Sequence, residues 1–415
     1  MGTQSLSMQL DELSIMSATH RSAIEIIEWL ASDACHALDS SGLIDVLAAM
    51  LCDSGMPVHR LVLHLRAPHP TIFGRSITWA PAEPIGVVDI EHGEEKSERV
   101  QKSPVLHVMA TREWLVLRAD DQRWALSDIF RGRGLAELCI APMIHGTGDG
   151  TASAVTIGTQ RHDGFSHADR ALLRRILPAL RSAIELQIWR RTTKTMLDTY
   201  IGSGPEQRVL SGHVRRGDVE TLEAALMFCD MHGFTDLSNR LSSERVLEVL
   251  NIYFDQVVPS VTQYGGEVLK FMGDGVLAFF RDEAGAGASC ASALKAAQLV
   301  GDRLDAISLP DAKIRAGIGL HYGQVSYGNF GAGQRLDFTV IGRDVNLASR
   351  IQGLCRQTSQ PLLLSRRFAQ LLTAPGAVSI GLRDVRGFTE PIELFAWMRR
   401  EEGLGCAPTR IANQP

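Results

Sequence analysis

The chain has 415 residues, which is long enough for two domains of ordinary size. Hydrophobic residues make up 45% and charged residues 21% of it, a balance that excludes an intrinsically disordered protein. The net charge of -5 argues against a general nucleic-acid binder, and no apolar run approaches the roughly 20 residues that cross a bilayer. The seven cysteines are scattered and form no CxxC pair, which predicts neither a disulfide framework nor a zinc site. The N-terminus has no signal-peptide pattern. Together these features predict a cytoplasmic protein.

The first half of the chain combines two helices with several short strands. Residues 1–17 are polar and predict a flexible lead, and apolar residues then recur at helical spacing over about 20–35 and again over 41–53. Short apolar runs predict strands at 60–66, 76–79, 114–117, 138–144 and 153–159. The composition of 146–150 predicts a turn between the last two. Together these elements predict an α+β domain over 18–188 with an antiparallel sheet.

A long helix follows this domain. Ser166 with Asp169 three residues later is a helix-start signature of the capping-box kind, and an apolar stripe continues from Leu173 towards Ile201. A helix of about 35 residues is roughly 50 Å long. We interpret it as a connector that pairs with its twin in a dimer; a solvated linker helix is the alternative. Residues 189–222 then form a connector and a short structured hinge, broken at 202–205.

Two aspartates mark the second half of the chain. An apolar run from Leu226 ends at Asp230, and Asp274 is flanked by glycines between two further apolar runs, which is a signal for a tight hairpin. If these strands are neighbours, the two carboxylates converge. Such a pair, with no Cys or His ligand beside it, suits Mg²⁺ or Mn²⁺ better than zinc. Ions of this kind commonly bring the phosphates of a nucleotide with them.

The remaining elements of this half alternate helices and strands. We predict helices over 243–263 and 283–305, strands over 314–321 and 324–330 joined near Tyr322-Gly323, a strand over 336–342 and a helix from 343. Asn346 and Arg350 are four apart on that helix and share one face. Alone, such a pair indicates a solvated surface, whereas beside a phosphate site it offers donors to negative charge. Residues 401–415 have no periodicity and predict a disordered tail.

Three motifs in this half carry a family resemblance. They are Phe228-x-Asp230-x-x-Gly233-Phe234-Thr235, Lys270-Phe271-Met272-Gly273-Asp274-Gly275 and Val345-Asn346-x-Ala348-x-Arg350. In this order and spacing they resemble a class III nucleotidyl cyclase catalytic domain, which implies a ferredoxin-like βαββαβ fold over 223–400. The first half resembles a GAF-like α/β sensor domain, with a PAS-like or purely structural α+β domain as the alternative. That resemblance implies a small-molecule ligand, which the sequence does not identify.

The cyclase resemblance implies a role for each matched residue. It implies that Asp230 and Asp274, with the backbone carbonyl of Met231, bind two divalent metals, Mg²⁺ or Mn²⁺. It further implies that Asn346 orients the ribose and that Arg350 stabilises charge on the α-phosphate.

Substrate and assembly are implied in the same way. Lys270 and Thr339 match the base-reading pair and point to ATP, and Arg386 is the nearest match to a residue that contacts the triphosphate. The aspartates and the Asn–Arg pair come from different subunits in this family, so the resemblance implies a homodimer with shared sites, regulated by the N-terminal domain. The implied function is an adenylate cyclase. A guanylate cyclase and a catalytically silent nucleotide-binding module are the alternatives.

Overall fold

A computed structural model describes residues 22–66, 68–119, 121, 124, 132–144, 152–333, 335–373 and 375–398. The predicted lead over 1–17, the turn over 146–150 and the tail over 401–415 lie outside these residues. The chain divides into two compact units, Met1–Met196 and Leu197–Pro415. No helix within the described ranges is long and apolar enough to cross a membrane.

The first unit is built on one antiparallel sheet of six strands in the order β3-β2-β1-β6-β5-β4. Its strands are β1 (Arg60–Leu65), β2 (Ile72–Trp79), β3 (Gly86–Glu91), β4 (Leu115–Arg118), β5 (Glu137–Ile144) and β6 (Ala152–Thr159). The prediction of an antiparallel α+β domain is therefore confirmed. The edge strand β3 was not predicted, because its side chains face solvent almost throughout and it lacks an apolar run on a buried face.

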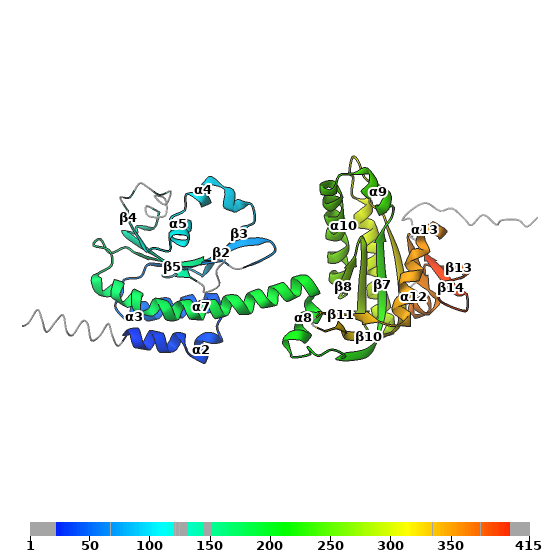
Figure 1. The fold of residues 1–415 in the computed structure, drawn as a ribbon, viewed down its shortest axis with the longest axis horizontal. Coiled ribbons are helices and arrows are strands. Elements are labelled where there is room, and N and C mark those ends of the chain that lie inside the picture. The colour runs from blue at the N-terminus through cyan, green and yellow to red at the C-terminus, as the bar shows by residue number, and fades with distance from the viewer. Residues whose placement is uncertain are drawn as a thin grey trace, which may run out of the picture. The chain divides into compact units, whose positions relative to one another are not determined.

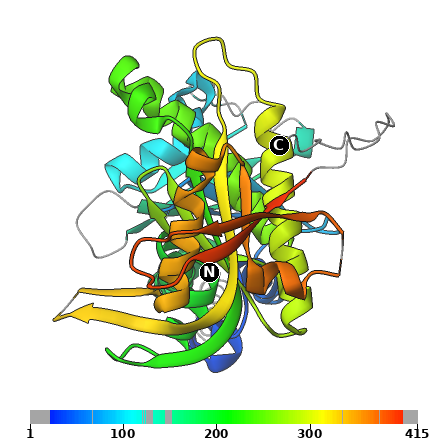
Figure 2. The ribbon, with the colours of Figure 1, turned by 90° about the vertical axis from the view of Figure 1, so that its right-hand side faces the viewer.

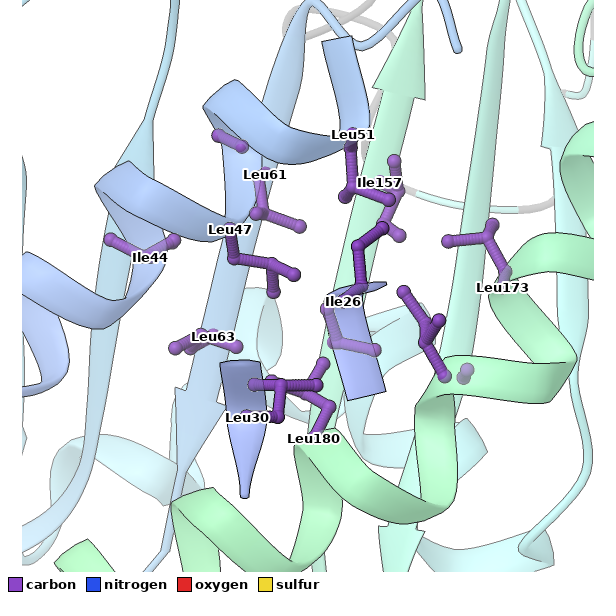
Figure 3. Close-up of a cluster of buried hydrophobic side chains, with 14 of the residues drawn as sticks. Ile26, Leu30, Ile44, Leu47, Leu51, Leu61, Leu63, Ile157, Leu173 and Leu180 are labelled. Atoms are coloured by element: carbon purple, nitrogen blue, oxygen red, sulfur yellow. The ribbon is translucent and has the colours of Figure 1, made fainter. Parts of the chain in front are cut away.

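Helices cover both faces of this sheet (Figure 1). A helix over 22–30, α2 (Asp33–His36), α3 (Ser40–Asp53) and α7 (His167–Ile201) pack on one face, and α4 (Glu98–Gln101) and α5 (Pro104–Thr111) lie on the other. Figure 3 shows how leucines of α3 and α7 meet the inward side chains of β1 and β6, including Leu47, Leu61 and Leu180. Burial of these side chains fixes both helices on the sheet.

The predicted start and length of the long helix are confirmed. Helix α7 has 35 residues, and its start is closed by two reciprocal hydrogen bonds. The Asp169 N–H donates to Oγ of Ser166 at 3.1 Å, and the Ser166 N–H donates to Oδ2 of Asp169 at 2.7 Å. These bonds satisfy donors that the first turn of a helix leaves free.

The second unit is built on an eight-stranded sheet. Seven strands run in the order β13-β14-β12-β10-β7-β9-β8, and β11 pairs with β10 off this path. They are β7 (Val219–Met231), β8 (Glu267–Met272), β9 (Gly275–Arg281), β10 (Ala316–Ala332), β11 (Arg335–Ile341), β12 (Leu362–Ser365), β13 (Ala377–Arg383) and β14 (Ile392–Trp397). The long strands β7 and β10 lie side by side through thirteen residue pairs, from Ala316 opposite Met231 to Gly328 opposite Val219, and are green and yellow in Figure 2.

The helices of this unit are α8 (Ser203–Leu210), α9 (Phe234–Arg240), α10 (Ser243–Gln263), α11 (Ala286–Asp305), α12 (Arg343–Gly353), α13 (Cys355–Thr358) and α14 (Arg366–Leu371). Helices α10 and α11 bury apolar stripes against β7, β9 and β10. The predicted hinge contains α8, whose Val209 packs with the separate core that includes Phe279 and Tyr327.

One predicted turn is wrong. Residues 314–321 and 324–330 were expected as two strands joined near Tyr322-Gly323, but a single strand, β10, runs through both residues. Gly323 stands where the Asp344 carboxylate approaches the strand, and a Cβ there would collide with it. Glycine inside a strand can mark such a close approach as well as a turn.

Candidate active site

Asp230 and Asp274 are brought together by three neighbouring strands. Asp230 is the penultimate residue of β7 and lies opposite Gly317 of β10. On its other side β7 pairs with β9, Cys229 opposite Val276, and β9 joins β8 through a hairpin with Met272 opposite Gly275. Asp274 therefore lies at the hairpin tip beside the end of β7. The predicted hairpin and the predicted convergence of the two aspartates are both confirmed by this topology.

Asp274 perturbs the carboxyl group of Asp230. Burial, and next the negative charge of Asp274, raise the pKa of Asp230 to about 6, and a hydrogen bond from Gln352 opposes the rise. Gly275 permits this proximity, since a Cβ on it would lie 3.2 Å from Oδ1 of Asp230. Two carboxylates that resist ionising together form a site where a divalent cation relieves the repulsion.

The donor set fits a hard divalent cation. In the part of the chain that the structure describes, no third His, Cys, Asp or Glu joins the aspartates to form a larger metal-binding group. Mg²⁺ is commonly held by one or two carboxylates, with water and substrate phosphates completing its shell. Met231, whose carbonyl was predicted as a further ligand, is buried directly after Asp230.

A basic hollow, lined in part by residues that follow Asp230 in the chain, was not predicted. It has a volume of about 630 Å³ and is lined by His232, Gly233, Lys313, Arg315 and Arg356. The His232 N–H donates to the carbonyl of Arg315 at 2.8 Å, which ties the residues after Asp230 to the lead-in of β10. Burial and these arginines lower the pKa of His232. The three cations that line this hollow can bind the oxygens of a polyphosphate.

Lys270 and Thr339 lie on neighbouring strands of this unit. Lys270 of β8 forms an ion pair with Asp337 of β11. Asp337 and Thr339 are two apart on one strand and share one face, so the ion pair directs Lys270 towards the face that carries Thr339. Asp337 was not predicted from the sequence as a site residue. Its ion pair orients Lys270, the lysine predicted to read the base.

Asn346 and Arg350 are exposed on α12. The same helix turns Gln352 towards the strands, where its side chain hydrogen-bonds Asp230 and donates to the carbonyl of Gly317 at 3.4 Å. Arg350 is two residues from Gln352, roughly 200° around the helix. The chain therefore brings Asp230 and Asp274 together but leaves Asn346 and Arg350 on another surface.

The start of α12 is fixed by a buried histidine. Nδ1 of His321 and Oγ of Ser365 share a hydrogen bond of 2.7 Å. Nε2 of His321 lies 3.3 Å from Oδ1 of Asp344, which is within ion-pair distance, but the two atoms are not aligned for a hydrogen bond. The Gln324 N–H donates to the Asp344 carboxylate at 2.8 Å. The neighbouring His321 and this donor hold the pKa of Asp344 below its ordinary value. These contacts position the helix that carries Asn346.

Arg386 lies in a loop that packs against α12, the helix of Asn346 and Arg350. It is exposed in the loop between β13 and β14, and within the described residues no contact joins it to Asp230, Asp274 or Arg350. The preceding Val385 is buried with Leu347 of α12. The loop therefore packs against α12, and the structure does not bring Arg386 to the acidic pair.

Comparison with known proteins agrees with this geometry. Residues 219–387 match the family described as the adenylate and guanylate cyclase catalytic domain. This part of the chain is a class III cyclase domain. An adenylate cyclase of Anabaena cylindrica is 32% identical over 198 residues, covering 44% of this chain and 38% of that protein. Adenylate cyclase 1 of Rhizobium meliloti is 32% identical over 162 residues, covering 37% and 24%.

A solved structure also resembles part of the chain. The crystal structure of the adenylyl cyclase CyaB from P. aeruginosa is 29% identical, covers 45% of this chain and 99% of that one, and has a TM-score of 0.39. The curated relatives are longer than the part aligned, since it spans 38% or less of each of the two named above.

Proposed function

We propose that the chain is an adenylate cyclase that converts ATP to 3′,5′-cyclic AMP and pyrophosphate. The observation that carries the proposal is the pair of carboxylates, Asp230 and Asp274, at adjoining strand ends. The basic hollow lined by residues that follow Asp230 supports it. Such a site can bind a nucleoside triphosphate together with its metal ions, because the carboxylates would hold the ions and the cations would hold the phosphates.

The residues of the acidic and basic halves have separate tasks. Asp230, Asp274 and the Met231 carbonyl would hold Mg²⁺ or Mn²⁺. Two such ions, when bound, supply Lewis acidity that favours ionisation of the ribose 3′-hydroxyl and neutralises phosphate charge. Lys313 and Arg315 would bind the β- and γ-phosphates. Attack of the 3′-oxygen on the α-phosphorus forms the cyclic ester bond and breaks the bond to pyrophosphate, which leaves.

A second copy of the chain would complete each site. Asn346 of that copy would orient the ribose, and Arg350 would donate to the charge that develops on the α-phosphate. The exposed positions of both residues in a single chain support this arrangement. So does a set of exposed apolar side chains on β8 and β11, namely Phe271, Met272, Leu336 and Ile341. Apolar surface of this kind marks an interaction site, and a homodimer with two shared sites would bury it.

Lys270 and Thr339 support ATP over GTP. A lysine can donate to N1 of adenine, and the hydroxyl of Thr339 can accept from the 6-amino group. The ion pair with Asp337 orients Lys270 for this contact. A guanylate cyclase remains the second candidate, because the matched family includes both activities.

We further propose that the first unit is a GAF-like sensor of a small molecule, which regulates the cyclase through α7. Its six-stranded antiparallel sheet with helices on both faces supports this assignment. The described cysteines are all free thiols, which supports a location in the reducing cytoplasm.

Product formation tests the proposal directly. The purified chain is offered ATP and GTP separately, with Mg²⁺ or Mn²⁺, and the cyclic products are quantified. We expect cyclic AMP from ATP, little product from GTP, and none from the Asp274→Asn variant or with excess chelator. Preferential turnover of GTP would establish the guanylate cyclase, and no turnover of either nucleotide would support the silent module.

A further inference from the structure

The first unit contains a pocket that is separate from the cyclase site. It encloses about 520 Å³, including its open mouth, between the β1–β2 hairpin and the last turns of α7 within this unit. Its apolar lining includes Leu65, Ile72 and Ile188. This lining suits the hydrocarbon part of a small molecule.

Some polar side chains that line the pocket already have hydrogen-bond partners within the protein. Oε1 of Gln187 accepts from the Ser40 hydroxyl at 2.7 Å, and its Nε2 donates to the Leu38 carbonyl at 3.1 Å. At the rim, Nδ1 of His69 accepts the N–H groups of Thr71 and Ile72 at 3.2 and 3.1 Å. This places the ring proton on Nε2, which leaves His69 as a neutral donor.

Thr192 is the exception among the polar groups of this wall. Its side chain is 9% exposed and lines the pocket, yet its hydroxyl has no hydrogen-bond partner within the described residues. A hydroxyl inside a helix ordinarily donates to the carbonyl four residues earlier. Leaving it unpaired and buried is costly, so this hydroxyl points to a polar atom of a ligand.

Two arginines line the same pocket, and they differ in their partners. Arg75 forms an ion pair with Asp89, in which Nη2 of Arg75 lies 2.6 Å from Oδ2 of Asp89. No carboxylate of the described residues lies within ion-pair distance of Arg191, although Asp89 and Asp39 lie near enough to influence it. Burial and the adjacent positive charge of Arg75 lower the pKa of Arg191. An anion placed beside Arg191 would relieve this repulsion.

We propose that this pocket binds a small carboxylic acid with an apolar body. The carboxylate accepts from the guanidinium of Arg191 and the hydroxyl of Thr192, and the body packs on Leu65, Ile72 and Ile188. The planar donors of arginine match a carboxylate closely. Because α7 continues unbroken to Ile201, the ligand contacts the same helix that leaves the first unit.

Binding of octanoate to the full chain tests this site, with 1-octanol as the uncharged probe. By titration calorimetry we expect saturable octanoate binding with a Kd of about 1 mM or lower, and binding at least about tenfold weaker for 1-octanol. The Arg191→Gln variant should lose about tenfold and Thr192→Val a smaller factor. Arg181→Gln, an exposed arginine on the same helix, is the matched control and should bind as wild type.

Amide exchange locates the bound probe. Octanoate should slow hydrogen exchange over 187–195 in the wild type but not in Arg191→Gln. The proposal is overturned by absence of saturable binding, by equal affinity of octanoate and 1-octanol, by an unaffected Arg191→Gln variant, or by protection confined to another segment. These readouts do not involve nucleotide turnover, so they are independent of the proposed cyclase activity.

Discussion

Replacing Asp274 by asparagine should stabilise the cyclase unit while abolishing its activity. The negative charge of Asp274 and burial together raise the pKa of Asp230 to about 6 from an ordinary 3.8. A carboxyl group whose pKa is raised by folding destabilises the folded state above that pKa, and this cost is relieved as pH falls through it. Without metal, the wild type should therefore gain stability as pH falls from about 7.5 towards 5.

The magnitude follows from the same shift. The rise from 3.8 to about 6 corresponds to about 3 kcal/mol at 1.36 kcal/mol per pH unit. The site is partly open to solvent, and burial, the larger cause, persists in the variant. We therefore expect Asp274→Asn to add about 1 kcal/mol at pH 7.5, or roughly 2–4 °C in the Tm of the cyclase unit.

Calorimetric melting in the presence of chelator, at pH 7.5 and pH 5, measures this effect. The gain should be present at pH 7.5 and largely absent at pH 5, and added Mg²⁺ should stabilise the wild type more than the variant. Asp255→Asn, on the exposed side of α10, is the control and should show no pH-dependent gain. A lower Tm for Asp274→Asn at pH 7.5, or an equal gain at both pH values, would refute the reasoning about the coupled pair.

Three further variants test other parts of the account. Lys270→Glu combined with Thr339→Cys should raise the ratio of cyclic GMP to cyclic AMP formed from equal ATP and GTP; an unchanged ratio would remove these residues from base recognition. Gly323→Ala should destabilise the cyclase unit by about 1–3 kcal/mol in urea unfolding, because its methyl group would collide with the Asp344 carboxylate. His321→Gln should lower kcat with little change in KM for ATP, because His321 positions α12 rather than contacting substrate; full activity would contradict that role.

Patterns with a local physical cause were predictable from the sequence. Helix α10 was predicted with the bounds that the structure shows, because its apolar residues recur at helical spacing towards the sheet. The hairpin at Asp274 followed from its flanking glycines, and the start of α7 from Ser166 and Asp169. In each case neighbouring residues alone determine the geometry.

Features that depend on distant residues were not predictable. Gly323 appeared to mark a turn because Asp344, which approaches it, is 21 positions later. Lys313 and Arg315 come from one segment and Arg356 from another, and the three gather only in the folded chain. The alternation of Lys313 and Arg315 around buried Ile314 was the one local signal for the basic hollow. Asp337 gained meaning only through its pairing with Lys270.

Mixing two inactive variants is the most direct test of the central claim that two copies share each site. Asp230→Ala and Arg350→Ala should each fail to form cyclic AMP alone. After equilibration at equal amounts, half of the dimers would be mixed with one intact site each, which predicts about a quarter of wild-type activity. No recovery, with exchange of subunits demonstrated, would contradict the shared site.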